Sequence, residues 1–220
     1  MTEEMNVVNF LFDNWLVVSI VAIIGYLLGS ISFSVIFTKI SNKKDIRNMG
    51  SKNAGFTNVL RSVGKMPAIL TLLCDFLKGI MAILISTFFI SITCGKIGDF
   101  ALGHVSCIVG FFCILGHVYP CFFGFKGGKG VITSASVILM TNWCVLLAIL
   151  FVFLLAFAFS RVVSFSSISA AIFYPVAALI FSVGLKDILL SIPVAILVIL
   201  KHKSNIANII GGREKKIFSW

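Results

Sequence analysis

Two lysines and four glycines share a short segment, residues 124–130, between long uncharged stretches of sequence. We call this segment the lysine-glycine loop. Ionisable side chains next to hydrocarbon are costly, so they are kept mainly where they have a use. Glycines let backbone N–H groups approach a ligand closely, and Lys126 and Lys129 add point charges suited to phosphate. The loop therefore predicts an anion site, with phosphate as the favoured ligand.

The lysine-glycine loop is not a Walker A loop, because Gly130 rather than Ser or Thr follows Lys129. A helix is predicted to begin at Val131, and its N-terminal N–H groups also favour an anion. The alternative is that both lysines only set the membrane topology or contact lipid headgroups. That alternative leaves the four glycines unexplained.

A second polar segment, residues 45–61, combines hydroxyl and amide side chains with two glycines and ends in Arg61. We call it the serine-asparagine loop. Ser, Thr and Asn side chains supply short hydrogen bonds to phosphate and hydroxyl oxygens, and Arg61 can hold a phosphate bidentately. A solvated, turn-rich loop is the alternative interpretation.

Near the C-terminus, His202 and Asn205 are three residues apart, so on a helical turn they share one face. A lone histidine at a membrane boundary is usually structural, and here a structural and a functional role are both open. His104 and His117 fall in a predicted span without the spacing of metal ligands, so we expect no metal site.

Asp75 and Lys78 are also three residues apart, within an otherwise apolar stretch. This spacing predicts an ion pair within one helix, facing the interior of a helix bundle. We expect the pair to support the site structurally rather than to take part in chemistry.

The composition places these groups in a membrane. Of 220 residues, 59% are hydrophobic and only 12% are charged, and the mean hydropathy is +1.10. That is too little charge to cover a soluble exterior, so we predict an integral, polytopic all-α membrane protein. The net charge of +10 is interpreted as basic cytoplasmic loops rather than a nucleic-acid surface. The six cysteines are interpreted as small buried apolar residues.

Long apolar stretches predict the first three spans at residues 15–38, 66–92 and 101–119, the second of them interrupted by Asp75 and Lys78. The segment 39–65 holds seven Lys and Arg against one acidic residue, which favours the cytoplasmic side. The N-terminus is then outside, and so is the short link around Lys96. The lysine-glycine loop returns to the cytoplasmic side.

The next 31 residues, 130–160, are uncharged, long for one span and short for two. Two crossings with a break at 141–142, followed by spans at 162–185 and 188–200, put 15 of the 18 Lys and Arg in the cytoplasm. We therefore predict seven spans in a single domain, 1–220, with the N-terminus outside and the C-terminus inside. Five spans remain the alternative.

Several motifs in order make the chain resemble the bacterial acyl-phosphate:glycerol-3-phosphate acyltransferases. They are Gly-Ser-x-Asn-x-Gly-x-Thr-Asn at 50–58, Asp-Phe-Leu-Lys-Gly at 75–79, Gly-His-x-Tyr-Pro at 116–120, Phe-Lys-Gly-Gly-Lys-Gly-Val at 125–131, and His-x-x-Asn-Ile at 202–206. The resemblance covers nearly the whole chain and implies the same seven-helix fold with the N-terminus outside.

The resemblance implies transfer of an acyl group from acyl phosphate to the 1-hydroxyl of sn-glycerol 3-phosphate. The product, lysophosphatidic acid, enters phospholipid biosynthesis. The implied site lies at the cytoplasmic face of the cell inner (plasma) membrane and needs no cofactor, nucleic acid or obligatory protein partner. The residues implicated by the resemblance are Ser51, Arg61, Lys129, His202 and Asn205, supported by Asn53, Thr57, Asn58, Lys126, Gly127 and Gly128.

The chain departs from the family pattern at several positions. Lys52 stands where the family has glycine, and Phe56 and Ile132 stand where it has alanine. Asn208 replaces the usual arginine, and the first span carries Ser32 and Ser34 where the family commonly has Pro or Thr and then Gly. Lys52 and Phe56 place larger side chains in a tightly built loop.

The implied chemistry is direct attack of the glycerol hydroxyl on the acyl-phosphate carbonyl, which needs mainly positioning and charge stabilisation. Ser51, Arg61, His202 and Asn205 would bind glycerol phosphate, and Lys129 with the glycine amides would hold acyl phosphate. The proton would go to His202 or to a phosphate oxygen. A covalent acyl-Ser51 lacks a base placed by spacing.

Two other functional classes share parts of this pattern. A transporter or channel for a phosphorylated anion is the alternative function, but it would place charges at midplane between repeats, and no repeat is present. A CDP-alcohol phosphotransferase would need clustered aspartates for metal, whereas the five aspartates here are scattered.

Overall fold

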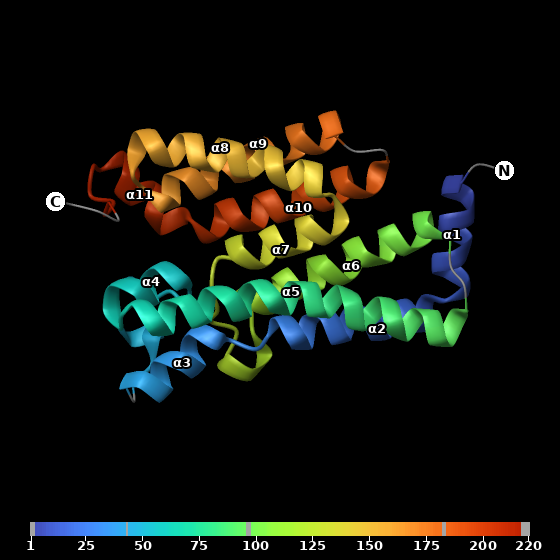
Figure 1. Cartoon of the computed structure of the whole chain (residues 1–220), viewed down its shortest axis with the longest axis horizontal. Coiled ribbons are helices and arrows are strands. Elements are labelled where there is room, and N and C mark those ends of the chain that lie inside the picture. The colour runs from blue at the N-terminus through green and yellow to red at the C-terminus, as the bar shows by residue number, and fades with distance from the viewer. Residues whose placement is uncertain (1–2, 43, 96–97, 182–183, 217–220) are drawn as a thin grey trace. The chain divides into compact units, whose positions relative to one another are not determined.

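The computed structural model describes residues 3–42, 44–95, 98–181 and 184–216. Within those ranges every regular element is a helix (Figure 1), which confirms the predicted all-α class. Lys96, in the predicted external link, and residues 182–183, in the sixth predicted span, lie outside the described residues. The chain forms two compact units, residues 1–140 and 141–220, which are described separately.

The first unit contains long helices, short connecting helices and both loops that are rich in polar residues. Its elements are α1 (Glu3–Asp13), α2 (Trp15–Gly29), α3 (Phe33–Asn42), η1 (Ile46–Asn48), α4 (Phe56–Ser62), α5 (Lys65–Cys94), α6 (Asp99–Val118), η2 (Cys121–Phe123) and α7 (Val131–Thr141). The second unit is formed by α8 (Trp143–Ser160), α9 (Val163–Phe181), α10 (Leu185–Lys201) and α11 (Lys203–Ile210).

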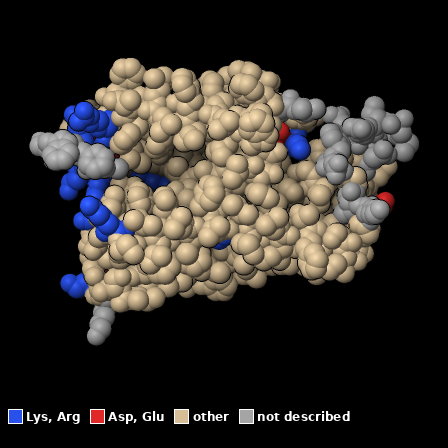
Figure 2. Space-filling view, viewed as in Figure 1, with Lys and Arg blue, Asp and Glu red and all other residues tan. Residues whose placement is uncertain are grey.

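Within the ranges described above, five helical segments are long and apolar enough to cross a membrane. They are Trp15–Asn42, Lys65–Cys94, Ala101–Phe123, Trp143–Ser160 and Val163–Phe181. Their outer surfaces carry exposed Leu, Ile and Phe side chains, and the face drawn in Figure 2 is almost free of charge over these helices. The prediction of a polytopic membrane helix bundle is therefore confirmed.

The first predicted span is not one continuous helix. Residues 15–38 were predicted as one span, and within that span α2 ends at Gly29 and α3 begins at Phe33. The backbone between them is held from outside the helix: Ser30 Oγ accepts a hydrogen bond from the Cys121 N–H at 3.4 Å, and the Ile31 carbonyl accepts one from Lys78 Nζ at 2.9 Å. Irregular backbone in an apolar layer is tolerated where such partners replace the helical ones.

The break predicted within residues 130–160 is confirmed. Helix α7 ends at Thr141, and Asn142 caps α8 by accepting a hydrogen bond from the Val145 N–H at 3.2 Å. The other side of the same amide donates to Asp187 Oδ2 at 3.1 Å. With 11 residues, α7 is about 16 Å long, roughly half the hydrocarbon thickness.

Glycines let α2 and α6 approach each other backbone to backbone. A Cβ added at Gly29 would overlap the Cys113 carbonyl, and one added at Gly116 would overlap the Tyr26 carbonyl. Gly25 and Gly29 are spaced as in the small-x-x-x-small pattern that brings membrane helices together. This close contact sets where α6 ends, and the lysine-glycine loop follows soon after that end.

Candidate functional site

The serine-asparagine loop is built around the buried amide of Asn58, which lies in the first turn of α4. Its Oδ1 accepts a hydrogen bond from the Ser51 N–H at 3.0 Å. Its Nδ2 lies within 3.3 Å of three backbone carbonyl oxygens, those of Ile46, Met49 and Asn53. An amide offers two donors and one carbonyl acceptor, so Asn58 is occupied by the loop itself. Asn58 was predicted to contact substrate; the structure instead makes it the organiser of the loop.

The remaining candidates in the serine-asparagine loop lie closer to its surface. Ser51 and Arg61 are exposed, and Asn53 and Thr57 are half-buried. Because Asn58 fixes the backbone of Ser51, the hydroxyl of Ser51 is presented by an ordered turn. The loop can therefore offer one hydroxyl and one guanidinium to a ligand.

Arg47 joins the serine-asparagine loop to the segment before the lysine-glycine loop. Its guanidinium forms an ion pair with Asp45 at 2.7 Å and donates to the Phe123 carbonyl. The side-chain hydrogen bond from Arg47 lowers the pKa of Asp45, although partial burial opposes the shift. Phe123 also packs against the buried cluster under the loop, together with Phe56. Two segments that are far apart in the sequence are thus held side by side.

The larger Phe56 side chain, one of the departures from the family pattern, is accommodated in this cluster. The buried members of the cluster are Val35, Ile46, Ala54, Val59 and Ala68. The ring covers apolar surface at the start of α4 instead of projecting into the loop.

In the lysine-glycine loop, Gly127 and Gly128 are required by close packing. A Cβ at Gly127 would overlap the His117 carbonyl, and one at Gly128 would overlap His117 Nε2 and lie 2.7 Å from the Ala54 carbonyl. The Gly128 N–H donates to the His117 carbonyl at 3.1 Å. The Gly128 N–H is thus used within the protein, and binding of acyl phosphate by the amides of the loop stays a prediction.

The two lysines of the loop are placed differently. Lys126 is exposed, whereas Lys129 is half-buried and directly precedes Gly130, which has a φ of +83°. Helix α7 follows at once, and the Ser134 N–H donates to the Gly130 carbonyl at 2.7 Å. Lys129 thus lies at the start of a helix, where the helix dipole also favours an anion.

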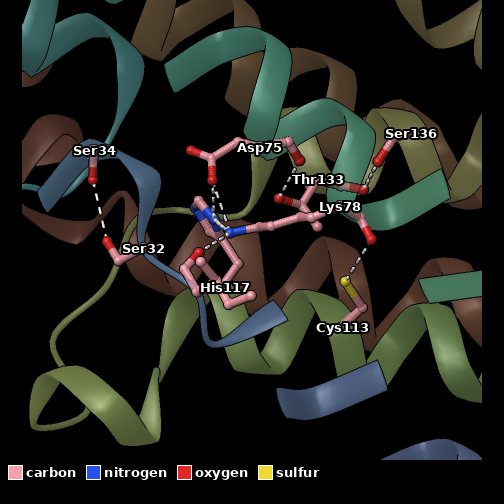
Figure 3. Close-up of polar contacts among 9 residues, drawn as sticks. Ser32, Ser34, Asp75, Lys78, Cys113, His117, Thr133 and Ser136 are labelled. Atoms are coloured by element: carbon pink, nitrogen blue, oxygen red, sulfur yellow. Dashed lines mark hydrogen bonds and ion pairs between the residues drawn. The ribbon is translucent and has the colours of Figure 1, made fainter. Parts of the chain in front are cut away.

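A buried ionic cluster lies below the lysine-glycine loop (Figure 3). Lys78 Nζ is 2.8 Å from Asp75 Oδ1, 3.0 Å from His117 Nδ1 and 2.9 Å from the Ile31 carbonyl oxygen. Asp75 and Lys78 are 2% and 5% exposed. The predicted Asp75–Lys78 ion pair facing the interior is confirmed. His117 is a third member of the cluster, which the sequence did not predict.

In the second unit, His202 lies at the junction of α10 and α11 and is almost fully buried. Its Nδ1 is 2.8 Å from the Val198 carbonyl oxygen. A carbonyl only accepts, so Nδ1 carries the proton and Nε2 is the nitrogen able to accept one.

Asn205 lies on α11 and takes part in a polar network with two other segments. Its Nδ2 donates to Ser164 Oγ at 2.9 Å and to Glu214 Oε1 at 2.7 Å. Ser164 Oγ donates in turn to the same carboxylate oxygen at 2.7 Å. The network fixes the amide of Asn205, which shows that this residue positions the chain after α11 whatever else it binds.

Across the described parts of the chain, no three His, Cys, Asp or Glu side chains are grouped so that they could hold a metal ion. The loops of the first unit instead offer hydroxyl, guanidinium and ammonium groups from Ser51, Arg61 and Lys129. Such groups bind phosphate oxygens through charge-assisted hydrogen bonds.

Lys52 adopts a left-handed backbone conformation, with a φ of +59°. This is the position where the family pattern has glycine. We expect Lys52→Gly to raise the free energy of unfolding by about 0.5–1 kcal/mol, because glycine adopts this conformation without the Cβ penalty. Denaturant unfolding in detergent measures the change.

Lys52→Ala is the matched control for this prediction. It removes the same charge and the same long side chain but keeps the Cβ, so it should give no gain. Equal stabilisation by both variants would assign the effect to the lost charge instead of the backbone.

The sequence of the chain matches known proteins over most of its length. The family described as glycerol-3-phosphate acyltransferase matches residues 19–212. The glycerol-3-phosphate acyltransferase of Neisseria meningitidis serogroup A is 43% identical over 194 residues, covering 88% of this chain and 94% of that protein. The corresponding protein of Shouchella clausii is 41% identical over 208 residues, covering 92% and 98%.

Two solved structures are also similar to the chain. The crystal structure of PlsY (YgiH), an integral membrane glycerol 3-phosphate acyltransferase, in its glycerol 3-phosphate form gives a TM-score of 0.80 at 35% identity, covering 91% of this chain and 96% of that one. The lysophosphatidic acid form gives 0.76 at 34% identity, covering 91% and 95%. Sequence and structure agree over almost the whole length, so the chain belongs to the glycerol-3-phosphate acyltransferase family.

Proposed function

We propose that this protein transfers the acyl group of an acyl phosphate to the 1-hydroxyl of sn-glycerol 3-phosphate, releasing lysophosphatidic acid and inorganic phosphate. The observation that carries the proposal is that Arg47 and Phe123 hold two basic loops together in the first unit, one of them rich in hydroxyl side chains. Both proposed substrates carry a phosphate. The solved relatives bear glycerol 3-phosphate and lysophosphatidic acid in their names, in agreement with the acceptor and the product.

The transfer is a direct displacement. The glycerol O1 attacks the acyl carbon, a new C–O ester bond forms, and the bond from the acyl carbon to the phosphate oxygen breaks. The hydroxyl proton goes to His202 Nε2 or to an oxygen of the departing phosphate. The protein supplies positioning and positive charge for the oxygens that gain negative charge.

The proposed site residues fall into groups according to the substrate that each binds. Ser51 and Arg61, on the ordered serine-asparagine loop, bind glycerol 3-phosphate, with Asn53 and Thr57 beside them. Lys129 holds acyl phosphate, and Lys126 adds to the local positive charge. His202 and Asn205 keep the roles in binding glycerol phosphate that the family resemblance implies.

We further propose seven crossings, with the N-terminus outside and the C-terminus in the cytoplasm. The five long apolar helices supply five crossings, and α7 and α10 supply two short or tilted ones. The exposed basic residues after α3, around α4 and after α10 support this orientation, because cytoplasmic segments are enriched in Lys and Arg. The protein would then lie in the cell inner membrane with its active site at the cytoplasmic face.

The donor is tested with purified protein in detergent. Acyl phosphate plus glycerol 3-phosphate should give lysophosphatidic acid without added divalent metal, whereas acyl-CoA should not replace acyl phosphate. The reason is that the polar loops are suited to a phosphate and no adenine or pantetheine site was identified in the sequence. Turnover with acyl-CoA alone, or activity that chelation removes and magnesium restores, would contradict the proposal.

Lys129→Ala should lower kcat/KM by about ten- to a hundredfold, the effect expected for loss of one charge-assisted contact. The thermal unfolding midpoint should stay near that of the wild type, because Lys129 is only half-buried. Lys44→Ala, which removes an exposed lysine beside the same polar loops, is the control and should retain full turnover. Near-normal activity of Lys129→Ala would reduce that lysine to a topology signal.

The seven-crossing topology predicts that the α7–α8 junction reaches the outside. In a variant without the six native cysteines, Trp143→Cys should react in intact cells with a reagent that cannot cross the membrane, since this side chain is 61% exposed. Lys44→Cys should react only after the cells are permeabilised. Protection at position 143 combined with outside labelling at Arg161→Cys would favour five crossings.

A further inference from the structure

The contact with Lys78 assigns the tautomer of His117. An ammonium group has three N–H donors and no acceptor. Lys78 Nζ lies 3.0 Å from His117 Nδ1, whereas Asp75 Oδ1 is 3.6 Å from the same nitrogen, too far for a hydrogen bond. Nδ1 therefore accepts from Lys78, and the proton of the neutral ring is on Nε2. The Asp75 carboxylate, 2.8 Å from Nζ, keeps Lys78 in its charged, donating form.

The opposite side of the same ring faces the lysine-glycine loop. His117 Nε2 and the Ala54 carbonyl both border the space that a Gly128 side chain would occupy, so Gly128 lies between them. The His117 backbone contributes as well, because its carbonyl accepts the Gly128 N–H at 3.1 Å. One residue therefore holds the loop with its side chain and with its main chain.

The same ammonium also fixes the break in the first span. Lys78 Nζ donates to the Ile31 carbonyl, which lies between α2 and α3. The other end of α3 leads into the serine-asparagine loop. Lys78 thus links α5 to both polar loops at once, through Ile31 on one side and through His117 on the other (Figure 3).

We propose that Asp75, Lys78 and His117 are positioning residues for the transfer reaction: together they set the place of the lysine-glycine loop and therefore the affinity for the substrate phosphate bound there. The identity of that phosphate rests on the proposed function. The three side chains are 2%, 5% and 8% exposed, so they act through the loop and not by touching substrate.

The decisive variant removes both charges of the pair. A single Lys78→Met change would leave Asp75 buried and uncompensated, and the protein could fail to fold. The double variant Asp75→Asn/Lys78→Met leaves no charge and nearly conserves volume. We expect it to fold, to raise the KM for acyl phosphate about ten- to a hundredfold through misplacement of the loop, and to leave the KM for glycerol 3-phosphate near the wild-type value.

His117→Asn separates positioning from folding. The Asn Oδ1 can still accept from Lys78, but no ring remains against Gly128. We expect a normal unfolding midpoint with the same rise in KM. Combining this variant with Gly128→Ala in a double-mutant cycle should give a non-additive effect on KM, because both changes act on one contact.

Asp187→Asn is the matched control, since Asp187 is an equally buried carboxylate that pairs with Asn142 in the second unit. It should lower the unfolding midpoint without changing either KM. The proposal would be overturned if the Asp75→Asn/Lys78→Met variant behaved in the same way, with lower stability and unchanged KM values. A rise confined to the KM for glycerol 3-phosphate would support the positioning role and reassign the phosphate.

A second readout does not depend on activity. The chain has three histidines, so nitrogen NMR of histidine-labelled protein can be assigned with single His→Gln variants. His117 should be protonated on Nε2 and His202 on Nδ1, and only the His117 signal should change in Asp75→Asn/Lys78→Met. An Nδ1-protonated His117 in the wild type would overturn the positioning scheme. A wild type without acyl-transfer activity but with the expected tautomers would count against the proposed function alone.

Discussion

The first unit depends on one buried ammonium. Lys78 is almost completely removed from solvent, and such a charge is tolerable only if it is paired and fully hydrogen-bonded. Its three partners come from three different segments: the carboxylate of Asp75 in its own helix, the carbonyl of Ile31, and the ring of His117. Because the charge must be satisfied, these segments must meet at one point, and the break in the first span follows from that requirement.

The two buried histidines of the described chain hold opposite tautomers because they face opposite kinds of partner. His117 meets an ammonium and must accept at Nδ1, whereas His202 meets a carbonyl and must donate from Nδ1. In the neutral rings, Nε2 of His117 therefore carries the proton, whereas Nε2 of His202 does not.

The sequence predicted what composition and local spacing determine, including the membrane class, the family, the Asp75–Lys78 pair and the helix break before Asn142. It did not predict contacts made across long separations. His117 was considered only as a metal ligand, because the sequence does not show that its partner is Lys78, 39 residues away. The break within the first span was not predicted, because hydropathy does not register a carbonyl that a distant lysine binds. Asn58 is of a residue type that often binds ligands. Only the structure shows that it is buried and that its amide oxygen and nitrogen are both hydrogen-bonded within the loop.

The backbone contact between α2 and α6 also fixes the position of each helix along the axis of the other. Gly29 faces the Cys113 carbonyl while Gly116 faces the Tyr26 carbonyl, so the two helices interlock at two levels. A slide along the axes of about 1.5 Å, the rise of one residue, would move both glycines away from the carbonyls that they face. The height of the α6 end is thereby fixed to within a fraction of a helical turn. The start of the lysine-glycine loop, a few residues after the end of α6, is positioned by the same contact.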